Sequence, residues 1–343
     1  MAWIDGSGVR LARERLGLTQ AELAERAGIS RQVVVTIETG RHVPSVGAAL
    51  RLAHCLGAPV EDLFRPQNAQ VEPIVSAVSE GDLVVAGRVD GQIVVHRVDE
   101  RESASGAWGV ADGQIDDGLR LFPTGSSAGL VVVGCDPALG VAAHLLAGHG
   151  ERRLVAVSAS TGAAVDALRA GRCHGILVHG PEPALPSPPC AVQRWHLARW
   201  QVGVGMPRTR RTPTLEAALT GRLGLVQREP SASSQQGLVR AAARLGTAVP
   251  TPLRIASGHL DAARTAALLG AGGVTFEPAS RTYGLSFVPL EVHVVELWVA
   301  ERFLEHPGVG ALGDLIASPA FQRQLAAIGG YDLVGCGSIK EAA

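Results

Sequence analysis

The 343-residue chain has very little lysine and few aromatic residues. Lys340 is its single lysine, although lysine and arginine together number 31, against 32 acidic residues. The formal net charge of -1 excludes a uniformly basic coat for nucleic acid, so any contact with DNA must be confined to one surface. Aromatic residues make up 4% of the chain, whereas 46% is hydrophobic and 42 residues are glycine. We therefore expect a sizeable core that is packed largely by small side chains.

The sequence also lacks paired cysteines and long apolar runs. Its five cysteines form no CxxC pair, and an odd number without paired spacing favours a reducing compartment over a disulfide scaffold. No uninterrupted apolar run approaches the roughly 20 residues that a membrane helix needs. The N-terminus shows no basic-then-apolar signal pattern. We therefore expect a cytoplasmic protein without membrane contact, and the length predicts two or three domains.

Helix signals dominate residues 1–67. Thr19 with Glu22 three residues later forms a capping box, and Gly28 is placed to end that helix. A second capped helix follows from Ser30, and a Pro-Ser pair then begins a third. Two short capped helices separated by a glycine turn predict a helix-turn-helix.

The stretches LTQAELAERAGIS and IETGRHVPS resemble the lambda-repressor-like (Xre-type) helix-turn-helix family. This resemblance implies an all-α domain that binds operator DNA with its second helix in the major groove. It also implies base contacts by Arg31, Gln32 and Thr36, with Val35 against a thymine methyl. Gln20 and Arg41 would contact phosphates. For Arg31, a phosphate contact is the open alternative.

The charge of this segment is weak. Residues 1–70 hold eight arginines and seven acids, which gives a net charge of +1. Val33 and Val35 also occupy positions that are often polar in the family, so hydrogen bonds to bases should be sparse. A single copy should therefore bind poorly, and we expect a homodimer on a two-part operator site.

Residues 68–125 predict a small β-rich connector. LVVAGRV and QIVVHRV flank Asp90-Gly91, which is typical of a hairpin with a tight turn. Residues 103–127 are rich in serine, glycine and aspartate, and this composition predicts a loop.

From residue 126 to the end, apolar strands alternate with alanine-rich helices. Such alternation predicts a parallel α/β sheet. Two strand–helix sets are separated by a proline-rich stretch at 181–190 and predict two lobes with a cleft between them. The second lobe is expected at about 204–288. The fold class is thus multidomain: a helix-turn-helix, a β-rich connector and a two-lobed α/β domain.

The two-lobed region has a resemblance of its own. GCDPALG after a strand, REPSASSQQGL, SFVPL and SPAFQRQLAAIGGYD look like the periplasmic-binding-protein-like domain of type II, over about 129–335. That fold also occurs in molybdate- and tungstate-binding proteins. The resemblance implies a ligand cleft, with molybdate, tungstate, a molybdenum-cofactor fragment, another anion or a small organic metabolite as candidate ligands.

Hydroxyl groups follow several of the expected strands. Helix N-termini at such strand ends favour negative charge, so these hydroxyls predict an oxyanion or polar ligand. The candidate ligand-binding residues are Cys135, Asp136, Ser158, Ser160, Thr161, Arg228, Ser231, Ser233, Ser234, Ser257, His259 and Tyr283.

Each of these candidates has a structural alternative. Serines are good helix caps anywhere, and Asp136 would repel an oxyanion unless it caps its helix before Pro137. Cys135 could be a nucleophile, a redox sensor or a buried apolar side chain. Tyr283 could close over a ligand or pack in the core. The histidines and cysteines fit no standard metal spacing, so we predict neither a metal site nor a cofactor.

These observations predict a one-component transcriptional regulator, not an enzyme. The N-terminal domain would bind operator DNA, and a small effector in the cleft would change that binding. Two alternatives stay open: a ligand-independent dimeric repressor, and an enzyme of cofactor metabolism with a DNA-binding module. A base beside Cys135 is the observation that would favour the enzyme.

Overall fold

The computed structural model describes residues 4–66, 71–98, 111–116, 118–122, 124–146, 150–208 and 214–340. The chain divides into two compact units, with the boundary between Ala128 and Gly129. Within the described ranges, no helix is both long enough and apolar enough to cross a membrane.

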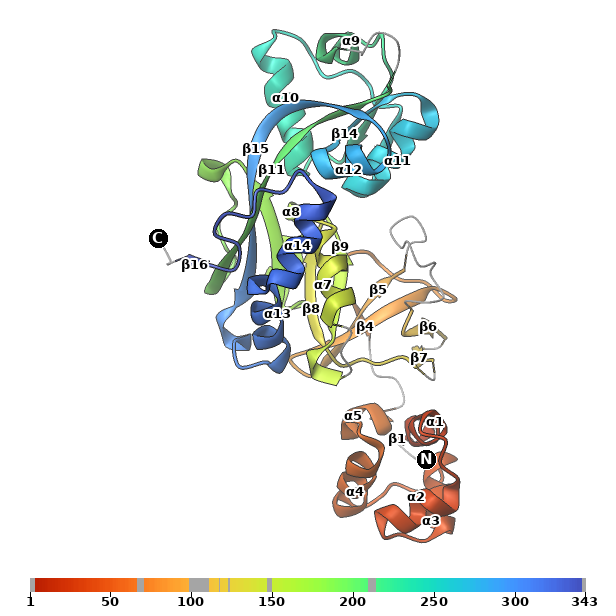
Figure 1. The fold of residues 1–343 in the computed structure, drawn as a ribbon. Helices are drawn as coiled ribbons and strands as arrows, with labels where there is room; N and C mark the ends of the chain where they lie inside the picture. The colour runs from red at the N-terminus through yellow and green to blue at the C-terminus, as the bar shows by residue number, and fades with distance from the viewer. Residues whose placement is uncertain are drawn as a thin grey trace. The chain divides into compact units, whose positions relative to one another are not determined.

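The first unit begins with a bundle of short helices (Figure 1). They are α1 (Ser7–Arg15), α2 (Gln20–Ala27), α3 (Arg31–Glu38), α4 (Val46–Leu56) and α5 (Val60–Leu63). The predicted caps are confirmed, since Thr19 and Glu22 form a capping box at α2 and Ser30 caps α3. Gly28 ends α2 with a φ of 61°. A small apolar core, including Leu23, holds the helices together.

The same unit contains a five-stranded sheet. Its strands are β3 (Val71–Pro73), β4 (Leu83–Val89), β5 (Gln92–Arg97), β6 (Gly113–Ile115) and β7 (Leu119–Leu121), in the order β3-β5-β4-β6-β7. The predicted hairpin is confirmed, because Asp90 and Gly91 join β4 to β5 with positive φ values of 49° and 81°. A further pair, β1 (Ile4–Asp5) with β2 (Arg65–Pro66), brackets the helices.

The prediction of a loop over 103–127 is wrong in part. Strands β6 and β7 lie in that range, and β6 pairs with β4. These strands are three residues long, so partners distant in sequence decide their structure, and local composition does not. Residues 103–110 lie outside the described residues.

The second unit is built on one nine-stranded sheet with the order β13-β12-β14-β11-β15-β10-β8-β9, and β16 pairs with β11. Its strands are β8 (Leu130–Gly134), β9 (Leu154–Ser158), β10 (Gly175–Gly180), β11 (Val192–Met206), β12 (Leu225–Arg228), β13 (Arg254–Ala256), β14 (Gly272–Phe276), β15 (Ser286–Ala300) and β16 (Ile339–Lys340). Its helices are α7 (Ala138–Leu146), α8 (Thr161–Arg169), α9 (Leu215–Leu219), α10 (Ser233–Arg244), α11 (His259–Leu269), α12 (Glu277–Thr282), α13 (Pro307–Ala317) and α14 (Pro319–Ile328), with 3-10 turns η1 (Gly150–Arg152), η2 (Glu182–Ala184) and η3 (Glu301–Phe303).

Two long antiparallel strands connect two lobes in this unit. β11 and β15 each span 15 residues and pair along their length, and they pass from the β8–β10 group to the β12–β14 group (Figure 1). The first lobe contains β8, β9 and β10 with α7 and α8. The second lobe contains β12, β13 and β14 with α10 and α11. Within each lobe these strands run parallel, as the strand–helix alternation predicted.

Candidate functional sites

The predicted recognition helix α3 exposes its N-terminal end. Arg31 and Gln32 form its first turn and are exposed, and Arg41 is exposed in the turn that follows the helix. In helix-turn-helix proteins, long polar side chains at the N-terminal end of the recognition helix contact base edges in the major groove. Contact of these three side chains with DNA stays a prediction.

The other three predicted DNA contacts already have partners inside the domain or are partly covered. The Thr36 hydroxyl donates to the Val33 carbonyl, and the Gln20 amide donates to Glu38 at 2.9 Å. Val35 is half-buried, and its carbonyl accepts from the Thr39 hydroxyl. Gln20 must exchange its bond to Glu38, or share it, if it is to hold a phosphate.

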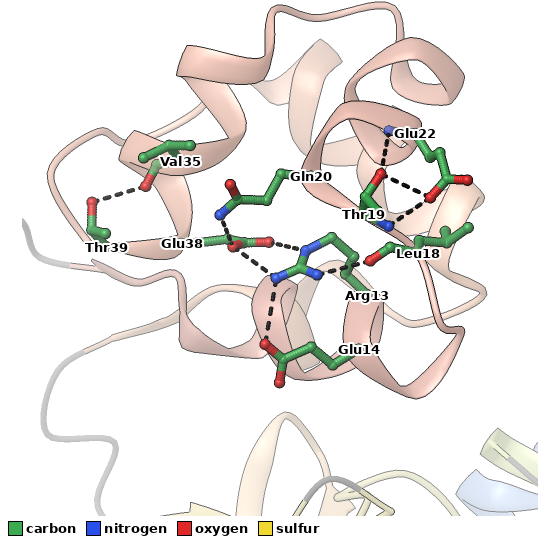
Figure 2. A network of polar contacts seen from close by, with 9 residues as sticks. All are labelled: Arg13, Glu14, Leu18, Thr19, Gln20, Glu22, Val35, Glu38 and Thr39. Carbon is green, nitrogen blue, oxygen red and sulfur yellow. Dashed lines mark hydrogen bonds and ion pairs between the residues drawn. The ribbon is translucent and has the colours of Figure 1, made fainter.

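A buried ion pair that sequence reasoning missed holds α1 against α3 (Figure 2). Arg13 Nε donates to Glu38 Oε1 at 2.6 Å, and Arg13 Nη1 donates to the Leu18 carbonyl at 2.8 Å. The Glu38 side chain is 2% exposed. Together with the Gln20 amide, this network fixes α3 to both preceding helices. The orientation of the recognition helix therefore depends on one buried carboxylate.

In the second unit, several polar side chains are buried together at strand ends of the two lobes. Cys135 follows β8, His179 lies near the end of β10, and His259 begins α11. One ligating atom of each of these residues lies within 4.8 Å of those of the other two. Their exposed fractions are 6%, 2% and 1%. The first two belong to the first lobe and the third belongs to the second lobe, so this cluster lies where the lobes meet.

Several buried polar groups of the second lobe have no hydrogen-bond partner among the described residues. They include Arg228 Nη1, Ser234 Oγ and both ring nitrogens of His259, besides Arg264 Nε and Ser280 Oγ. The rest of the Arg228 guanidinium is held in place, because Nε and Nη2 donate to the carbonyls of Ala256 and Ser257. Buried polar groups are nearly always paired in native proteins, so these unpaired groups call for a partner such as a ligand, an ion or a water molecule.

Asp136 has a complete set of internal partners. One carboxylate oxygen accepts from the Ala138 backbone N–H, which caps α7, and from the Tyr331 hydroxyl at 2.7 Å. The other oxygen accepts from Trp200 Nε1 at 2.9 Å. Burial raises the pKa of Asp136. This arrangement matches the capping alternative, and it occupies the oxygens that a ligand with donor groups would need.

The serine-rich turns of the two lobes face each other. A Cβ built on Gly162 at the start of α8 would lie 3.4 Å from Ser231 Cβ, and a Cβ built on Gly258 would lie 3.7 Å from Ser158 Oγ. Ser160 caps α8. Thus the predicted strand-end turns of the two lobes lie close to each other.

The remaining predicted ligand residues have varied surroundings. The hydroxyl of Thr161 accepts from the His179 backbone N–H, whereas Ser257 donates from N–H and hydroxyl to Asp261. Ser233 begins α10 and is half-buried. Tyr283 packs on the apolar core, and Tyr331 is the tyrosine that contacts Asp136. A ligand role for the residues of this cleft stays a prediction.

Sequence reasoning missed a chain of side chains that orients the cluster. His179 Nδ1 lies 2.8 Å from His293 Nδ1, and His293 Nε2 lies 2.7 Å from Glu291 Oε1. His179 Nε2 lies 3.0 Å from Cys135 Sγ. Trp200 packs beside these rings, with its centroid 4.6 Å from that of His179. His179 and His293 sit in apolar strands more than 100 residues apart in sequence, and neither strand has a motif that marks its histidine.

Burial keeps the cluster uncharged. It raises the pKa of the Cys135 thiol to about 12 and lowers the pKa values of His179 and His259 well below the usual histidine range. A thiol and neutral imidazoles are therefore the resting forms at neutral pH. Such groups can bind an ion that displaces the thiol proton, but they do not form a ready thiolate–imidazolium pair.

Comparison with known proteins agrees with both parts of the structure. A helix-turn-helix domain family matches residues 6–65, and a PBP superfamily domain matches residues 142–317, just over half of the chain. These matches define the class: an HTH-type transcriptional regulator joined to a PBP superfamily domain. The chain belongs to the PBP superfamily, and its N-terminal region belongs to the HTH-type transcriptional regulators.

The relatives resemble the N-terminal region. An uncharacterized HTH-type transcriptional regulator of Methanothermobacter thermautotrophicus is 49% identical over 57 residues, which cover 16% of this chain and 83% of that protein. YgzD of Bacillus subtilis, also an uncharacterized HTH-type transcriptional regulator, is 39% identical over 56 residues, which cover 16% of this chain and 85% of that protein.

Two solved structures are also similar to parts of the chain. The restriction-modification controller protein C.AhdI from Aeromonas hydrophila is 34% identical, with a TM-score of 0.17, and the match covers 17% of this chain and 89% of that one. A putative phosphate ABC transporter substrate-binding protein from Clostridium perfringens, with bound phosphate, is 12% identical, with a TM-score of 0.48. That match covers 60% of this chain and 99% of the other.

Proposed function

We propose that the protein is a one-component transcriptional regulator whose DNA binding is controlled by a small effector in the cleft of its second unit. The observation that carries the proposal is the set of buried, unpaired donors Arg228 Nη1, Ser234 Oγ and His259, counted within the described residues. They lie in a chain that also has a helix-turn-helix. An effector changes DNA binding only through its different affinities for the two conformations of the regulator.

The DNA-binding half of the proposal rests on α3. Arg31 and Gln32 are exposed at its N-terminal end, and they can reach guanine and adenine edges. The weak charge of the domain supports a homodimer on a two-part operator, since two copies double the phosphate contacts.

We propose an oxyanion, with molybdate and tungstate as the first candidates, as one effector class. Arg228 supplies a fixed guanidinium with one unpaired nitrogen, as far as the described residues show, and Ser234 lies in the first turn of α10. Helix N-termini and uncharged donors are suited to an anion that has lost its water. Cys135 and the histidines beside it favour a different class, which is developed in the next subsection.

The DNA-binding test uses Arg31→Ala in the full chain on the operator selected by the wild-type protein. We expect specific affinity to fall by about 1–3 kcal/mol, with weaker discrimination at one base position. Arg169→Ala is the matched control, because Arg169 is an exposed arginine at the end of α8 in the other unit. A uniform loss on all sequences would assign Arg31 to phosphate binding, and no loss would exclude it from the interface.

The effector test is a thermal-unfolding screen with molybdate, tungstate, sulfate and phosphate. A ligand at 100 times its Kd stabilises the folded protein by about 2.7 kcal/mol, so binding is readily detected. Each stabilising anion is then added to the DNA-binding assay at constant ionic strength. If none of the four stabilises the protein, the oxyanion class is wrong. If stabilising ligands leave DNA affinity unchanged, effector control is wrong.

The enzyme alternative is favoured by one observation and opposed by another. His179 Nε2 lies 3.0 Å from Cys135 Sγ, so a base does stand beside the thiol. However, burial raises the pKa of that thiol to about 12, which opposes a nucleophilic thiolate. The oxygens of Asp136 are bound to Trp200 and Tyr331 and do not activate Cys135. We therefore retain the regulator as the conclusion.

A further inference from the structure

The Cys135–His179–His259 cluster has the donor atoms of a transition-metal site. A thiol sulfur and two imidazole nitrogens are the ligands that borderline-soft metals such as Zn²⁺ prefer. One such atom from each residue lies within 4.8 Å of the other two, and all three side chains are buried. Bonds of about 2.0–2.3 Å to a central ion require only small shifts to bring these atoms together.

The neighbouring residues fix which nitrogen of His179 is available. Glu291 accepts only, so His293 Nε2 carries the proton of the 2.7 Å contact between them. Neutral His293 then has no proton on Nδ1, which must accept from His179 Nδ1 at 2.8 Å. His179 Nε2 consequently carries no proton, and its lone pair is available toward Cys135 Sγ, which lies 3.0 Å away.

This chain has the form of the outer-shell support found around metal-bound histidines. A ligating histidine usually donates its second ring N–H to a partner that fixes its orientation, and a carboxylate commonly ends the chain. Here Arg240 Nε also donates to Glu291 at 3.1 Å, which holds the carboxylate in its charged form. The pKa of Glu291 is lowered to about 2, although burial acts in the opposite direction, by its hydrogen bonds to His293 and Arg240.

His259 supplies an independent observation. Its side chain is 1% exposed, yet neither ring nitrogen has a hydrogen-bond partner within the described part of the chain. A buried imidazole without partners costs free energy, and a metal ion that accepts its lone pair would remove part of that cost. An ordinary core histidine, such as His174, shows the contrast, since its Nδ1 accepts from the Val131 N–H.

We propose that Cys135 Sγ, His179 Nε2 and one ring nitrogen of His259 bind a borderline-soft transition-metal ion of the Zn²⁺ type. This inference rests on the proposed function in one respect, because it names the ligand class of the same cleft. On binding, a sulfur–metal bond forms, the thiol S–H bond breaks, and the proton leaves to solvent. Three protein ligands leave a fourth coordination position open to an exogenous ligand. This proposal differs from the prediction from spacing, which named no metal site.

The charged side chains around the cluster include both signs, so they do not exclude a cation. The Arg228 guanidinium is close enough to act on Cys135, and so are the carboxylates of Asp136 and Glu229. The thiolate that forms on binding adds one further negative charge. Bridging of ligands from β8, β10 and α11 would also tie the first lobe to the second, which gives the ion a preference for one arrangement of the lobes.

The test uses the full chain, stripped with a chelator, and titrated with Zn²⁺ and with Co²⁺ as a spectroscopic substitute. We expect one tightly bound ion per chain and a cobalt–thiolate charge-transfer band. Cys135→Ser should abolish the band and weaken binding at least 100-fold. Cys173→Ser is the matched control, because Cys173 is also buried but lies outside the cluster, and it should bind as the wild type does.

His259→Gln provides a second variant if circular dichroism shows that Cys135→Ser is unfolded. It should also weaken binding, by at least tenfold, while it retains a thiolate band at high Co²⁺. Absence of tight binding in the stripped wild type, or wild-type affinity in both folded variants, would overturn the inference.

DNA affinity with and without Zn²⁺ separates this inference from the proposed function. Tight binding that depends on Cys135, with unchanged DNA affinity, supports the metal site and removes the metal as effector. An anion-dependent change of DNA affinity in a protein that binds no metal supports the regulator and overturns the metal site.

Discussion

The Cys135 thiol and the lone pair of His179 Nε2 are 3.0 Å apart in a setting where burial opposes both ions that a proton transfer would create. The same pair of residue types in a polar cleft would form a thiolate–imidazolium pair. The difference lies in the burial of the two side chains and in the tautomer that Glu291 imposes through His293. At the residue scale, the surroundings decide between a nucleophile and a metal ligand.

We expect Cys135 in the chelator-treated native protein to resist iodoacetamide at pH 7. Its pKa is raised to about 12 by burial, so the reactive thiolate is scarce and the sulfur is shielded. Exposed Cys190 is the internal control and should react with an ordinary surface rate. Peptide mass spectrometry over time measures both rates. If Cys135 reacted as fast as Cys190, its thiol would be reactive, and this result would favour the enzyme alternative over the regulator.

At the scale of elements, the recognition helix is positioned by one buried carboxylate. Glu38 lies at the end of α3 and accepts from Arg13 in α1 and from Gln20 in α2. Apolar packing through residues such as Leu23 and Ile37 brings the helices together, but it is not directional. The ion pair adds a fixed register between α1 and α3.

Glu38→Ala should loosen the helix-turn-helix by about 3–5 kcal/mol, because it leaves the Arg13 guanidinium buried without its partner. Native-state hydrogen exchange in the full chain should show at least a hundredfold faster exchange for the amides of α2 and α3. Glu25→Ala, on the exposed face of α2, is the matched control and should leave exchange nearly unchanged. Equal protection in both variants would mean that the ion pair is dispensable.

The strand pair β8 and β10 contains a second test of burial. His174 Nδ1 accepts from the Val131 N–H, and burial lowers the pKa of His174 to about 3, with His306 and Arg302 acting in the same direction. A histidine whose pKa is lower in the folded state stabilises the fold above its unfolded pKa of about 6.5. That stability is lost as pH falls from 6.5 toward 3.

Between pH 7 and pH 4.5 the wild type should therefore lose about 2–3 kcal/mol more stability than His174→Asn. The asparagine side-chain oxygen can still accept from Val131, but it does not titrate. Urea unfolding followed by circular dichroism measures the difference. His144→Asn, at an exposed position on α7, should keep the wild-type pH dependence. Parallel pH profiles for all three proteins would contradict the assignment.

At the scale of the whole molecule, the first unit contains a polar junction between its helices and its sheet. Asp62 in α5 accepts from Arg88 in β4 at 3.4 Å and from the Ser127 hydroxyl at 2.5 Å. Ser127 lies two residues before Gly129, where the second unit begins. The chain therefore enters the second unit directly after a residue that is hydrogen-bonded to α5, the last helix of the helix-turn-helix region.

Arg88→Ala should reduce the coupling between effector and DNA by about 1 kcal/mol, a sizeable part of a typical coupling energy. Operator affinity without effector and effector affinity without DNA should each stay within about twofold of the wild type. Arg97→Ala, on the exposed side of β5, is the control. The measurement is a thermodynamic cycle of the four binding constants. Full coupling in Arg88→Ala would show that this junction does not transmit the signal.

The sequence predicted elements whose signals are local. The caps at Thr19 and Ser30 and the turn at Asp90-Gly91 are each set by a few adjacent residues, and all are confirmed. The strand–helix alternation predicted the two lobes for the same reason. The short strands β6 and β7 were missed, because their pairing depends on partners far away in the chain.

The site was predicted only in part for a related reason. Serines at strand ends and Arg228 could be named as candidates because a strand followed by a helix marks the turn between them. His179 and His293 could not be named, because each lies within an apolar strand. Only the folded structure brings their Nδ1 atoms to 2.8 Å from each other. Spacing rules for metals likewise assume ligands that are close in sequence, and Cys135, His179 and His259 are not.

The pairing of β11 with β15 places Trp200 directly opposite His293, and register shifts flank this pair at His196/Ala198 and Val202/Gly203. The indole lies with its ring centroid 5.5 Å from that of His259, which belongs to the second lobe. Any movement of one lobe against the other must bend these strands and change the surroundings of this ring. A natural fluorophore thus lies at the boundary between the two lobes, so a change in their arrangement should alter its light emission without an attached label.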